Sequence, residues 1–553
     1  MNGFRQRLIK KSGVITTILA GMFAGQIICG SYSCKAAVAS ADVDNWQYTA
    51  GEINRLKKQY PSADAVILKQ SVSIEMDEQG LITYGIMRRV ALFTDNGIRR
   101  YADPRLMYNA ATQGLTVSTA RVYMRDGIQV DSGKNAFNPS TPFAFAEAPD
   151  YTDWQEMVVT HVGIEKDCVA ELNYTICDKE RWQPWLSGIE CLACEDFSLL
   201  SMLTIKVPSG MDLNYTYSNG VQDPQFPSEG VYSWALANVP CRPPMDGGVW
   251  QGDHIPAIVF STAKDWGEVV EHVANIFKEY TVLQPIEVVE PFAANENNIF
   301  ALHKESIGSV RNIDLPIRLF ASNARHAEQI YQSAYAHALD RALILSAKLR
   351  ARGVDSVPVL VSAGHNWCGE VAALEYFDRI LIEVKPADTG DALLLDPDHE
   401  YFRDTKSMMP GKTMLRCTGD GEIVQIAQGT PADNQTSLQV RLTMDGEGKL
   451  SGEGSVVMTG IFSPYYSVRG LKNETEEFIK SKVERILPSA TLRSWNIQTL
   501  DRNHVELGFL FESELPAANE HGRTYLDVPT PFSLELSRID GIHSERSHYP
   551  API

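Results

Sequence analysis

The sequence of 553 residues lacks the short motifs that mark many metal- and nucleotide-dependent enzymes. It contains no His-Glu-x-x-His, no Gly-x-x-x-x-Gly-Lys-Ser/Thr, and no Gly-x-Gly-x-x-Gly after a strand pattern. Those spacings bring together the zinc ligands or the backbone N–H groups that such sites require. We therefore expect neither a cofactor nor a metal ion.

Basic residues are also scarce. Lysine and arginine number 50 against 69 aspartates and glutamates, which gives a formal net charge of −19. A chain this acidic is repelled by phosphate backbones and by anionic lipid surfaces. The net negative charge therefore excludes a nucleic acid that would be bound through overall charge attraction.

The N-terminus is the exception to this acidity. Four basic residues between residues 5 and 11 precede an apolar run from 14 to 28, and Ala37-Val38-Ala39 then forms a small-x-small cleavage site. This order predicts a signal peptide over residues 1–39, and hence an exported protein of the periplasm or cell envelope. An uncleaved anchor is the alternative, but the apolar run is shorter than the roughly 20 residues of a spanning helix.

Cysteines number nine, and two of them, Cys29 and Cys34, lie inside the predicted signal peptide. Cys34 follows a small residue and suits lipid attachment better than Cys29, so we expect membrane association only through a lipid or an N-terminal anchor. Cys191 and Cys194 form a lone Cys-x-x-Cys. Without a second pair at zinc-finger spacing a metal is disfavoured, whereas a disulfide and simple thiol burial both stay open.

Short strand patterns fill the first part of the mature chain. Residues 65–74 and 81–93 are rich in β-branched and aromatic side chains and are separated by Asp77-Glu78-Gln79-Gly80, which predicts a hairpin. Asp126-Gly127 predicts a second tight turn. Further strands follow up to about residue 260. We expect residues 45–260 to form an N-terminal β-sandwich, because that fold buries many short strands.

The pattern changes to helices near residue 261. Apolar residues at helical spacing predict helices over 265–280 and 299–310, and a long one over 327–352 that ends at Gly353. Three strands follow, over 357–362, 376–384 and 392–395. Helices followed by antiparallel strands predict a central α+β domain over residues 261–410.

Strands dominate again near the C-terminus. Residues 438–444, 450–458, 491–500, 505–511 and 533–536 have strand patterns, and a helix is expected over 474–486. Residues 398–433 are rich in turn formers and predict a joining region. We therefore expect a C-terminal β-rich domain over residues 430–553.

The order of several phrases resembles a family of exported bacterial proteins. These phrases include Leu92-Phe93-Thr94-Asp95-Asn96-Gly97, Val207-Pro208-Ser209-Gly210 and Leu349-Arg350-Ala351-Arg352-Gly353. Members of the family have an N-terminal β domain of unknown function, a transglutaminase-like domain with a papain-like core, and often a C-terminal β domain. The resemblance covers most of the mature chain.

The resemblance also places the family's catalytic triad. Active relatives have Gly-Asp-Cys-Lys-Asp-Lys-Ala, where this chain has Ala336-His337-Ala338-Leu339-Asp340-Arg341-Ala342. The cysteine position is Ala338. The family's Phe-Asn-His is here Phe377-Asp378-Arg379, so Arg379 stands at the histidine position. The family's aspartate before proline is retained as Asp396.

These exchanges remove the chemistry that the resemblance implies. Alanine has no nucleophile, and arginine stays protonated near neutral pH and cannot act as a general base. We expect Asp396 either to pair with Arg379 or to be a simple turn former. The loss of Gly-Asp also favours a helix that runs straight through Ala336 and His337, which would remove the exposed N–H groups of a helix start.

Two functions remain open from the sequence. The first is a non-catalytic envelope protein whose degenerate transglutaminase-like domain binds a peptide, a protein or a glycan. The second is an active cysteine-dependent amidase, peptidase or transglutaminase with a relocated nucleophile, for which Cys368 beside His365 is the candidate. Catalytic pairs usually meet in space rather than in sequence, which favours the first function. His337 is expected to be a structural residue.

Overall fold

The computed structural model describes residues 15–16, 49–145, 148–151, 153–181, 183–242, 255–281, 292–313, 324–362, 369–388, 392–398, 412–419, 421–426, 435–445, 449–468, 472–486, 490–501, 504–513, 518–520 and 523–525. The predicted cleavage site, Cys29, Cys34, Cys368 and the strand expected over 533–536 lie outside these residues. The chain divides into a large unit, with residues 33–405 and 412–426, and a C-terminal unit around residues 427–542.

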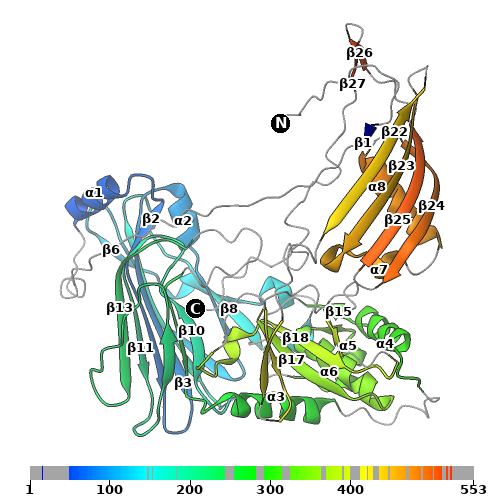
Figure 1. Ribbon diagram of the computed structural model, residues 1–553. Coiled ribbons are helices and arrows are strands. Elements are labelled where there is room, and N and C mark those ends of the chain that lie inside the picture. Colours follow the sequence, from blue (N-terminus) through cyan, green and yellow to red (C-terminus); the bar gives the residue numbers. More distant parts are fainter. Residues whose placement is uncertain are drawn as a thin grey trace. The chain divides into compact units, whose positions relative to one another are not determined.

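The large unit begins with a β domain built on two principal sheets (Figure 1). The first sheet has the order β13 (Val231–Val239), β11 (Ser198–Lys206), β2 (Ala65–Met76), β3 (Ile82–Leu92), β9 (Val169–Asp178), β5 (Gln113–Tyr123) and β6 (Gln129–Asp131). The second has the order β10 (Ser187–Cys191), β14 (Ala257–Ser261) and β12 (Asn214–Tyr217). Neighbouring strands are antiparallel, except that β11 and β2 are parallel.

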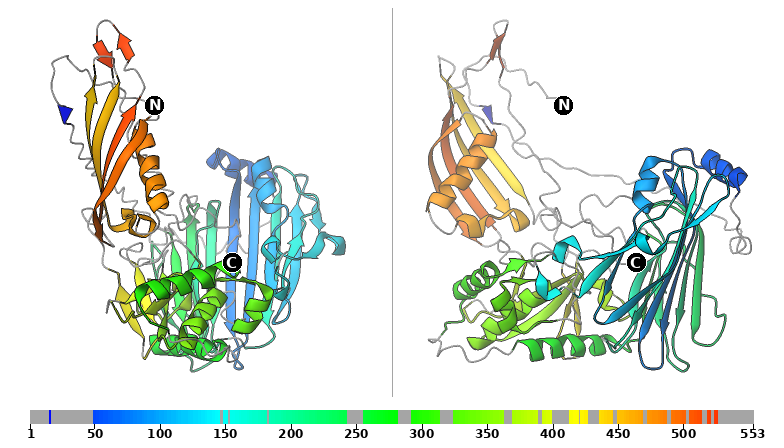
Figure 2. Two further views of the ribbon diagram at one scale, coloured as in Figure 1. Left: turned by 90° about the vertical axis from the view of Figure 1, so that its right-hand side faces the viewer. Right: turned by 180° about the vertical axis from the view of Figure 1, so that it is seen from behind.

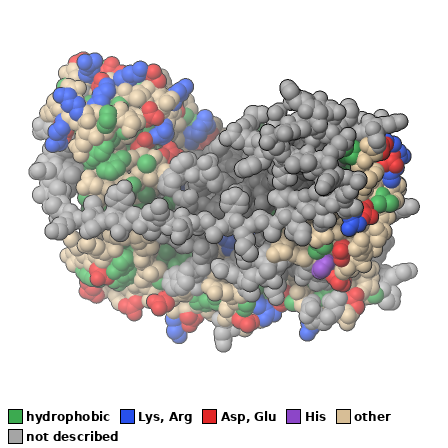
Figure 3. Space-filling model, turned by 45° about the horizontal axis from the view of Figure 1, so that its top comes forward, with side chains coloured by type: hydrophobic (Ala, Val, Ile, Leu, Met, Phe, Trp, Pro, Cys, Tyr) green, Lys and Arg blue, Asp and Glu red, His purple; other side chains and the backbone are tan. Residues whose placement is uncertain are grey.

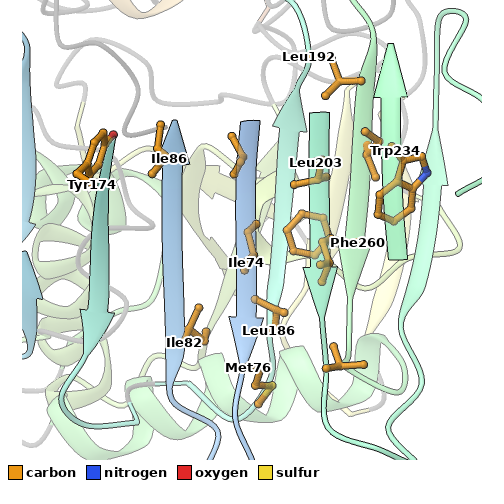
Figure 4. Packing of buried hydrophobic residues seen from close by; sticks show 14 of the residues in the cluster. Ile74, Met76, Ile82, Ile86, Tyr174, Leu186, Leu192, Leu203, Trp234 and Phe260 are labelled. Carbon is orange, nitrogen blue, oxygen red and sulfur yellow. The ribbon is translucent and has the colours of Figure 1, made fainter. Parts of the chain in front are cut away.

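The hydrophobic core of this domain lies between the two sheets. Ile74, Ile86 and Leu203 from the first sheet belong to the same buried cluster as Ile258 and Phe260 from the second. Figure 4 shows several of these side chains, with Phe260 close to Leu203. Gly188, the neighbour of Phe260 within the second sheet, leaves room for that ring, since a Cβ there would lie 2.4 Å from a ring carbon of Phe260. The arrangement is the face-to-face sheet packing expected from the alternating strands.

Shorter elements complete the β domain. A third sheet has the order β4 (Arg105–Asn109), β8 (Trp154–Val159) and β7 (Phe137–Ser140). The helices are α1 (Ala50–Gln59) and α2 (Asp95–Tyr101), and 3₁₀ turns cover Lys134–Ala136, Phe143–Phe145 and Pro149–Tyr151. Neither α-helix was expected from the sequence. Thr94 caps α2 by accepting from the N–H of Gly97, so Asp95-Asn96-Gly97 begins a helix.

The rest of the large unit packs helices against an antiparallel sheet. The sheet order is β19 (Leu393–Leu395), β18 (Arg379–Val384), β17 (Ser356–Ser362), β20 (Thr413–Arg416) and β21 (Glu422–Gln425). The helices are α3 (Trp266–Tyr280), α4 (Glu296–Gly308), α5 (Ala327–Ser333) and α6 (Ala338–Ala351), with a 3₁₀ turn at Leu374–Tyr376. Two short strands, β15 (Arg311–Asn312) and β16 (Tyr335–Ala336), pair in parallel.

This α+β arrangement agrees with the expected order of helices and strands. Helix α6 lies against β17 and β18 (Figure 1), and its residues from Leu339 to Ala347 are all buried. The sheet continues beyond the expected boundary at residue 410, because β20 and β21 pair onto β17. Part of the predicted joining region is therefore the far edge of the central sheet.

The C-terminal unit has its own sheet and core. The order is β1 (Ile15–Thr16), β22 (Thr436–Met444), β23 (Leu450–Thr459), β25 (His504–Ser513) and β24 (Ala490–Asp501). The remaining elements are α7 (Tyr465–Val468), α8 (Lys472–Ile486), β26 (Ala518–Glu520), β27 (Arg523–Tyr525) and a 3₁₀ turn at Gly460–Phe462. Helix α8 runs along one face of the sheet (Figure 2), where Ile479 joins a core with Leu507 and Phe511.

Candidate functional site

The site expected from the sequence lies around the first turn of α6. Helix α5 ends at Ala334, whose φ of 58° and ψ of 22° are left-handed. The chain then extends through β16, where the N–H of Arg311 donates to the carbonyl of Ala334 over 2.9 Å. The expectation of one helix through Ala336 and His337 is therefore wrong. The parallel pairing of β15 with β16 separates the two helices. Helix propensities of neighbouring residues cannot predict this pairing, because β15 lies outside the helical segment.

Ala338 is the first residue of α6 and is partly exposed. His337 is the N-cap, with extended backbone, and its Nδ1 accepts a hydrogen bond from the N–H of Leu339 over 3.1 Å. A helix start is where a nucleophilic thiol would have its pKa lowered. In this chain the helix start presents the methyl group of Ala338.

His337 holds the helix start as a neutral imidazole. Its side chain is completely buried, and Nε2 lies 3.6 Å from Oδ2 of Asp340. Burial lowers the pKa of His337 to about 4, although Asp340 acts in the opposite direction. At neutral pH the ring therefore accepts the N-cap hydrogen bond through Nδ1, which agrees with the expected structural role.

Arg379 and Asp396 form an ion pair at the adjoining strand ends. Nη1 of Arg379 lies 3.4 Å from Oδ2 of Asp396, and the two side chains are 11% and 4% exposed. Oδ1 of Asp396 accepts from the N–H of Asp398 over 2.9 Å, and its backbone carbonyl lies 2.7 Å from Nε2 of His303. Asp396 therefore fits both alternatives: Oδ2 pairs with Arg379, and Oδ1 forms the turn at Pro397. The guanidinium of Arg379 is therefore the cation beside this carboxylate.

The described cysteines lie elsewhere. Six cysteines are described, and five of them belong to the β domain. Burial raises the pKa of Cys168 to about 11 and that of Cys417 to about 12. Neither buried thiol is a thiolate at neutral pH, so neither has the reactivity of a nucleophile.

A buried polar network that the sequence analysis missed surrounds Asp340, two residues after Ala338. Asp340 is fully buried. Its Oδ2 accepts from Nε of Arg325 over 2.7 Å and from the hydroxyl of Tyr151 over 2.8 Å, and its Oδ1 accepts from the N–H of Arg325 over 3.1 Å. Burial raises the pKa of Tyr151, and the charge on Asp340 raises it further, so the hydroxyl stays protonated and donates.

Arg325 connects this network to the β domain. Nη1 donates to Oδ2 of Asp150 over 2.6 Å and to Oγ of Ser333 over 3.0 Å, and Nη2 donates to the carbonyl of Tyr335 over 2.7 Å. The guanidinium carbon lies 4.7 Å from the ring centre of Tyr151 and 5.0 Å from that of Tyr335. A buried charge needs this many partners to offset its desolvation. The 3₁₀ turn Pro149–Tyr151 thereby becomes part of the helix start.

A second buried arginine fixes the same turn of α6 from the other side. Nε of Arg341 donates to the carbonyl of Pro397 over 2.7 Å, and Nη1 donates to the carbonyl of Val310 over 2.8 Å. Asp398 lies 3.6 Å from Nε of Arg341. The signal that could have found both networks is Asp340-Arg341 itself, because these two charged residues interrupt the otherwise apolar stretch 338–345.

A cavity of about 300 Å³ opens beside Arg325. Its walls come from the turn after β4, from the turn before β8 and from the residues before and within α5. Asp150, Tyr151, Asp153, Trp154 and Arg325 are among its lining residues. The cavity and the Asp340 network therefore share Tyr151 and Arg325.

The chain matches one protein family over part of its length and resembles a solved structure in fold. Residues 78–243 match the family described as a domain of unknown function with solved structure, DUF3857. A crystal structure from Parabacteroides distasonis, described as a candidate protease, aligns with a TM-score of 0.59 at 17% identity and covers 86% of this chain and 96% of its own. No curated protein matches. The chain is thus similar in fold to that protein and contains a DUF3857 domain.

Proposed function

We propose that this protein is a non-catalytic, exported protein of the cell envelope. Its central domain is a degenerate transglutaminase-like domain that binds a peptide, a protein or a glycan. The observation that carries the proposal is the triad itself. A methyl group at Ala338 occupies the nucleophile position, and a guanidinium at Arg379 is paired with Asp396 where a general base would stand.

The surroundings of Ala338 support a structural rather than a chemical use of the helix start. Covalent catalysis needs a nucleophile that a neighbouring base can deprotonate. The first turn of α6 offers instead a neutral, buried His337 that is engaged as an N-cap, and a carboxylate, Asp340, that is engaged by Arg325 and Tyr151. The polar groups here hold the helix in place.

The charge distribution supports a partner other than nucleic acid. On the face shown in Figure 3, acidic and basic side chains are interspersed over the described surface. With a formal net charge of −19, such a surface has no attraction for phosphate backbones. In the described residues, every helix is too short or too polar to cross a bilayer. A lipid or an N-terminal anchor remains the proposed route to a membrane.

The experiment that tests the proposal introduces the missing groups. Ala338→Cys places a thiol at the start of α6, and Ala351→Cys places one at its exposed last residue as the matched control. The helix dipole lowers a thiol pKa at the first position and raises it at the second, so iodoacetamide should alkylate Cys at 338 about tenfold faster near pH 7. Site-resolved peptide mass spectrometry separates both from the native thiols.

The alternative enzyme is tested in the unaltered chain. An electrophile directed at amide-cleaving cysteines should label no cysteine stoichiometrically, and a Cys368→Ser variant should give the same pattern. Specific, complete labelling of Cys368 that is lost in the serine variant would show an active cysteine enzyme. The same labelling assay on Ala338→Cys/Arg379→His tests whether these two residues alone account for the lack of a reactive cysteine.

A further inference from the structure

The cavity beside Arg325 has a size that suits one side chain. Its volume of about 300 Å³ lies at the lower limit for small-molecule pockets. The walls combine the aromatic side chains of Tyr151 and Trp154 with the carboxylates of Asp150 and Asp153. Such walls accept a group that has an apolar stem and a polar, charged end.

The charge of the lining residues is negative once Arg325 is accounted for. A guanidinium has five N–H donors, and four of those on Arg325 are engaged by Asp340, Asp150, Ser333 and the carbonyl of Tyr335. Its single charge is balanced by the fully buried Asp340. Asp150 keeps 30% of its side chain exposed beside its ion pair with Arg325, and Asp153 is exposed, so the residues that line the cavity carry a net negative charge.

The backbone of the cavity is held in place independently of any occupant. The carbonyl of Asp153 accepts from the N–H of Ala110 over 2.6 Å, which ties the two wall-forming turns together. Oδ1 of Asn109 accepts from the N–H groups of Ala111 and Thr112 over 3.0 and 3.2 Å. Pre-formed walls lower the ordering cost of binding.

We infer that this cavity binds the positively charged side chain of a peptide or protein partner, with Asp150 and Asp153 facing the cation and Tyr151 and Trp154 lining its stem. The inference rests on the proposed binding function and narrows it from peptide, protein or glycan to a basic polypeptide. Lysine and arginine share the required chemistry, and the experiment distinguishes them.

The probes are Nα-acetyl methylamides of arginine, lysine and norleucine, titrated into the full chain and followed by NMR or calorimetry. Norleucine keeps the stem and removes the charge. At least one of the basic probes should bind about tenfold more tightly than norleucine, because a charge-assisted hydrogen bond to a carboxylate is lost in the neutral probe. Equal affinity for all three, or no binding of either basic probe, would overturn the inference.

Three variants locate the binding. Asp153→Asn should weaken the basic probe about tenfold while norleucine is unchanged, and Asp212→Asn, an exposed carboxylate of the same domain, is the control that should change nothing. Ala111→Phe places a ring at an exposed wall position and leaves the charge unchanged. It should block the binding of the basic probes and of norleucine alike. An unaffected affinity in both Asp153→Asn and Ala111→Phe contradicts this location.

Failure of the two proposals can be told apart. Incubation of the chain with the tightest probe and a glutamine-containing peptide, analysed by mass spectrometry, reports any amide cleavage or cross-link. A product would refute the non-catalytic function while leaving the binding site in place. Loss of the charge preference without any product would refute the site alone.

Discussion

The hydroxyl of Tyr151 donates to Oδ2 of Asp340 across 2.8 Å, although the two residues are 189 positions apart in the chain. Tyr151 belongs to a turn of the β domain, and Asp340 lies in the first turn of α6. This hydrogen bond therefore makes the β domain a structural part of the start of α6, and its removal should lower the stability of the protein.

We expect Tyr151→Phe to lower the free energy of unfolding by about 1–3 kcal/mol, because it leaves a buried carboxylate with one donor fewer. Urea denaturation measures the change. Tyr217→Phe is the matched control, since the Tyr217 hydroxyl donates to Asp223 over 2.7 Å at an exposed site. The control should cost well under 1 kcal/mol. Equal costs for both variants would contradict the importance assigned to Asp340.

Arg325→Met should be more damaging than any other single change in this network. It leaves the fully buried Asp340 without its cation, which costs roughly 3–5 kcal/mol. Adding Asp340→Leu removes the stranded charge, so the double variant should be more stable than Arg325→Met alone. A double-mutant cycle by urea denaturation measures this coupling. Additive losses would show that the ion pair is unimportant.

His337 should make the protein less stable as the pH falls. Burial lowers its folded-state pKa to about 4 from 6.5, so between these values the unfolded state binds a proton that the folded state does not. Stability should therefore rise with pH from about 4 to 6.5, by roughly 3 kcal/mol in total, and then level off. Asp340 and Arg325 are the charged groups that face the ring.

The variant His337→Asn separates this effect from other titrations. Asparagine is a good N-cap and does not titrate, so the slope of stability against pH should be shallower in the variant. His161 and His272 also have pKa values lowered by burial, and they contribute equally to both proteins. Denaturation curves at pH 7 and pH 5 give the comparison, and parallel slopes would rule out His337 as the source.

Asp396→Asn tests the buried ion pair between Arg379 and Asp396. The amide can still accept from the N–H of Asp398, but Arg379 loses its counter-charge while only 11% exposed. We expect a loss of about 1–3 kcal/mol. Glu453→Gln breaks the exposed pair with Arg441 and should cost less than about 1 kcal/mol. Thermal unfolding of the two variants ranks them, and the reverse order would be incompatible with a buried pair.

Local patterns in the sequence were sufficient for much of the fold. The hairpin of β2 and β3 follows from β-rich strand patterns around a polar turn, and α3 follows from its apolar face. The break between α5 and α6 could not be found in this way. It depends on a left-handed Ala334 and on a pairing with residues 311–312, and alanine is the best helix former.

The same contrast holds at the site. Short motifs singled out Ala338, Arg379 and Asp396 as candidates, and the pairing of the last two, which the structure shows, was one of the alternatives. Tyr151 and Arg325 were missed, because Tyr151 lies 189 positions from Asp340 and neither residue belongs to a periodic pattern. Contacts between distant segments leave no trace in local spacing, so only the three-dimensional arrangement shows that Asp340 depends on another domain.

The engagement of Asp340 by Tyr151 also sets the smallest piece of this protein that can be handled separately. A fragment beginning at residue 261 would retain Asp340 and Arg325 but would lack Asp150 and the Tyr151 ring that cover them. Cutting at the boundary that the strand and helix patterns suggest would therefore expose a charged interior to water. Expression trials should begin with residues 49–426, in which both partners are present.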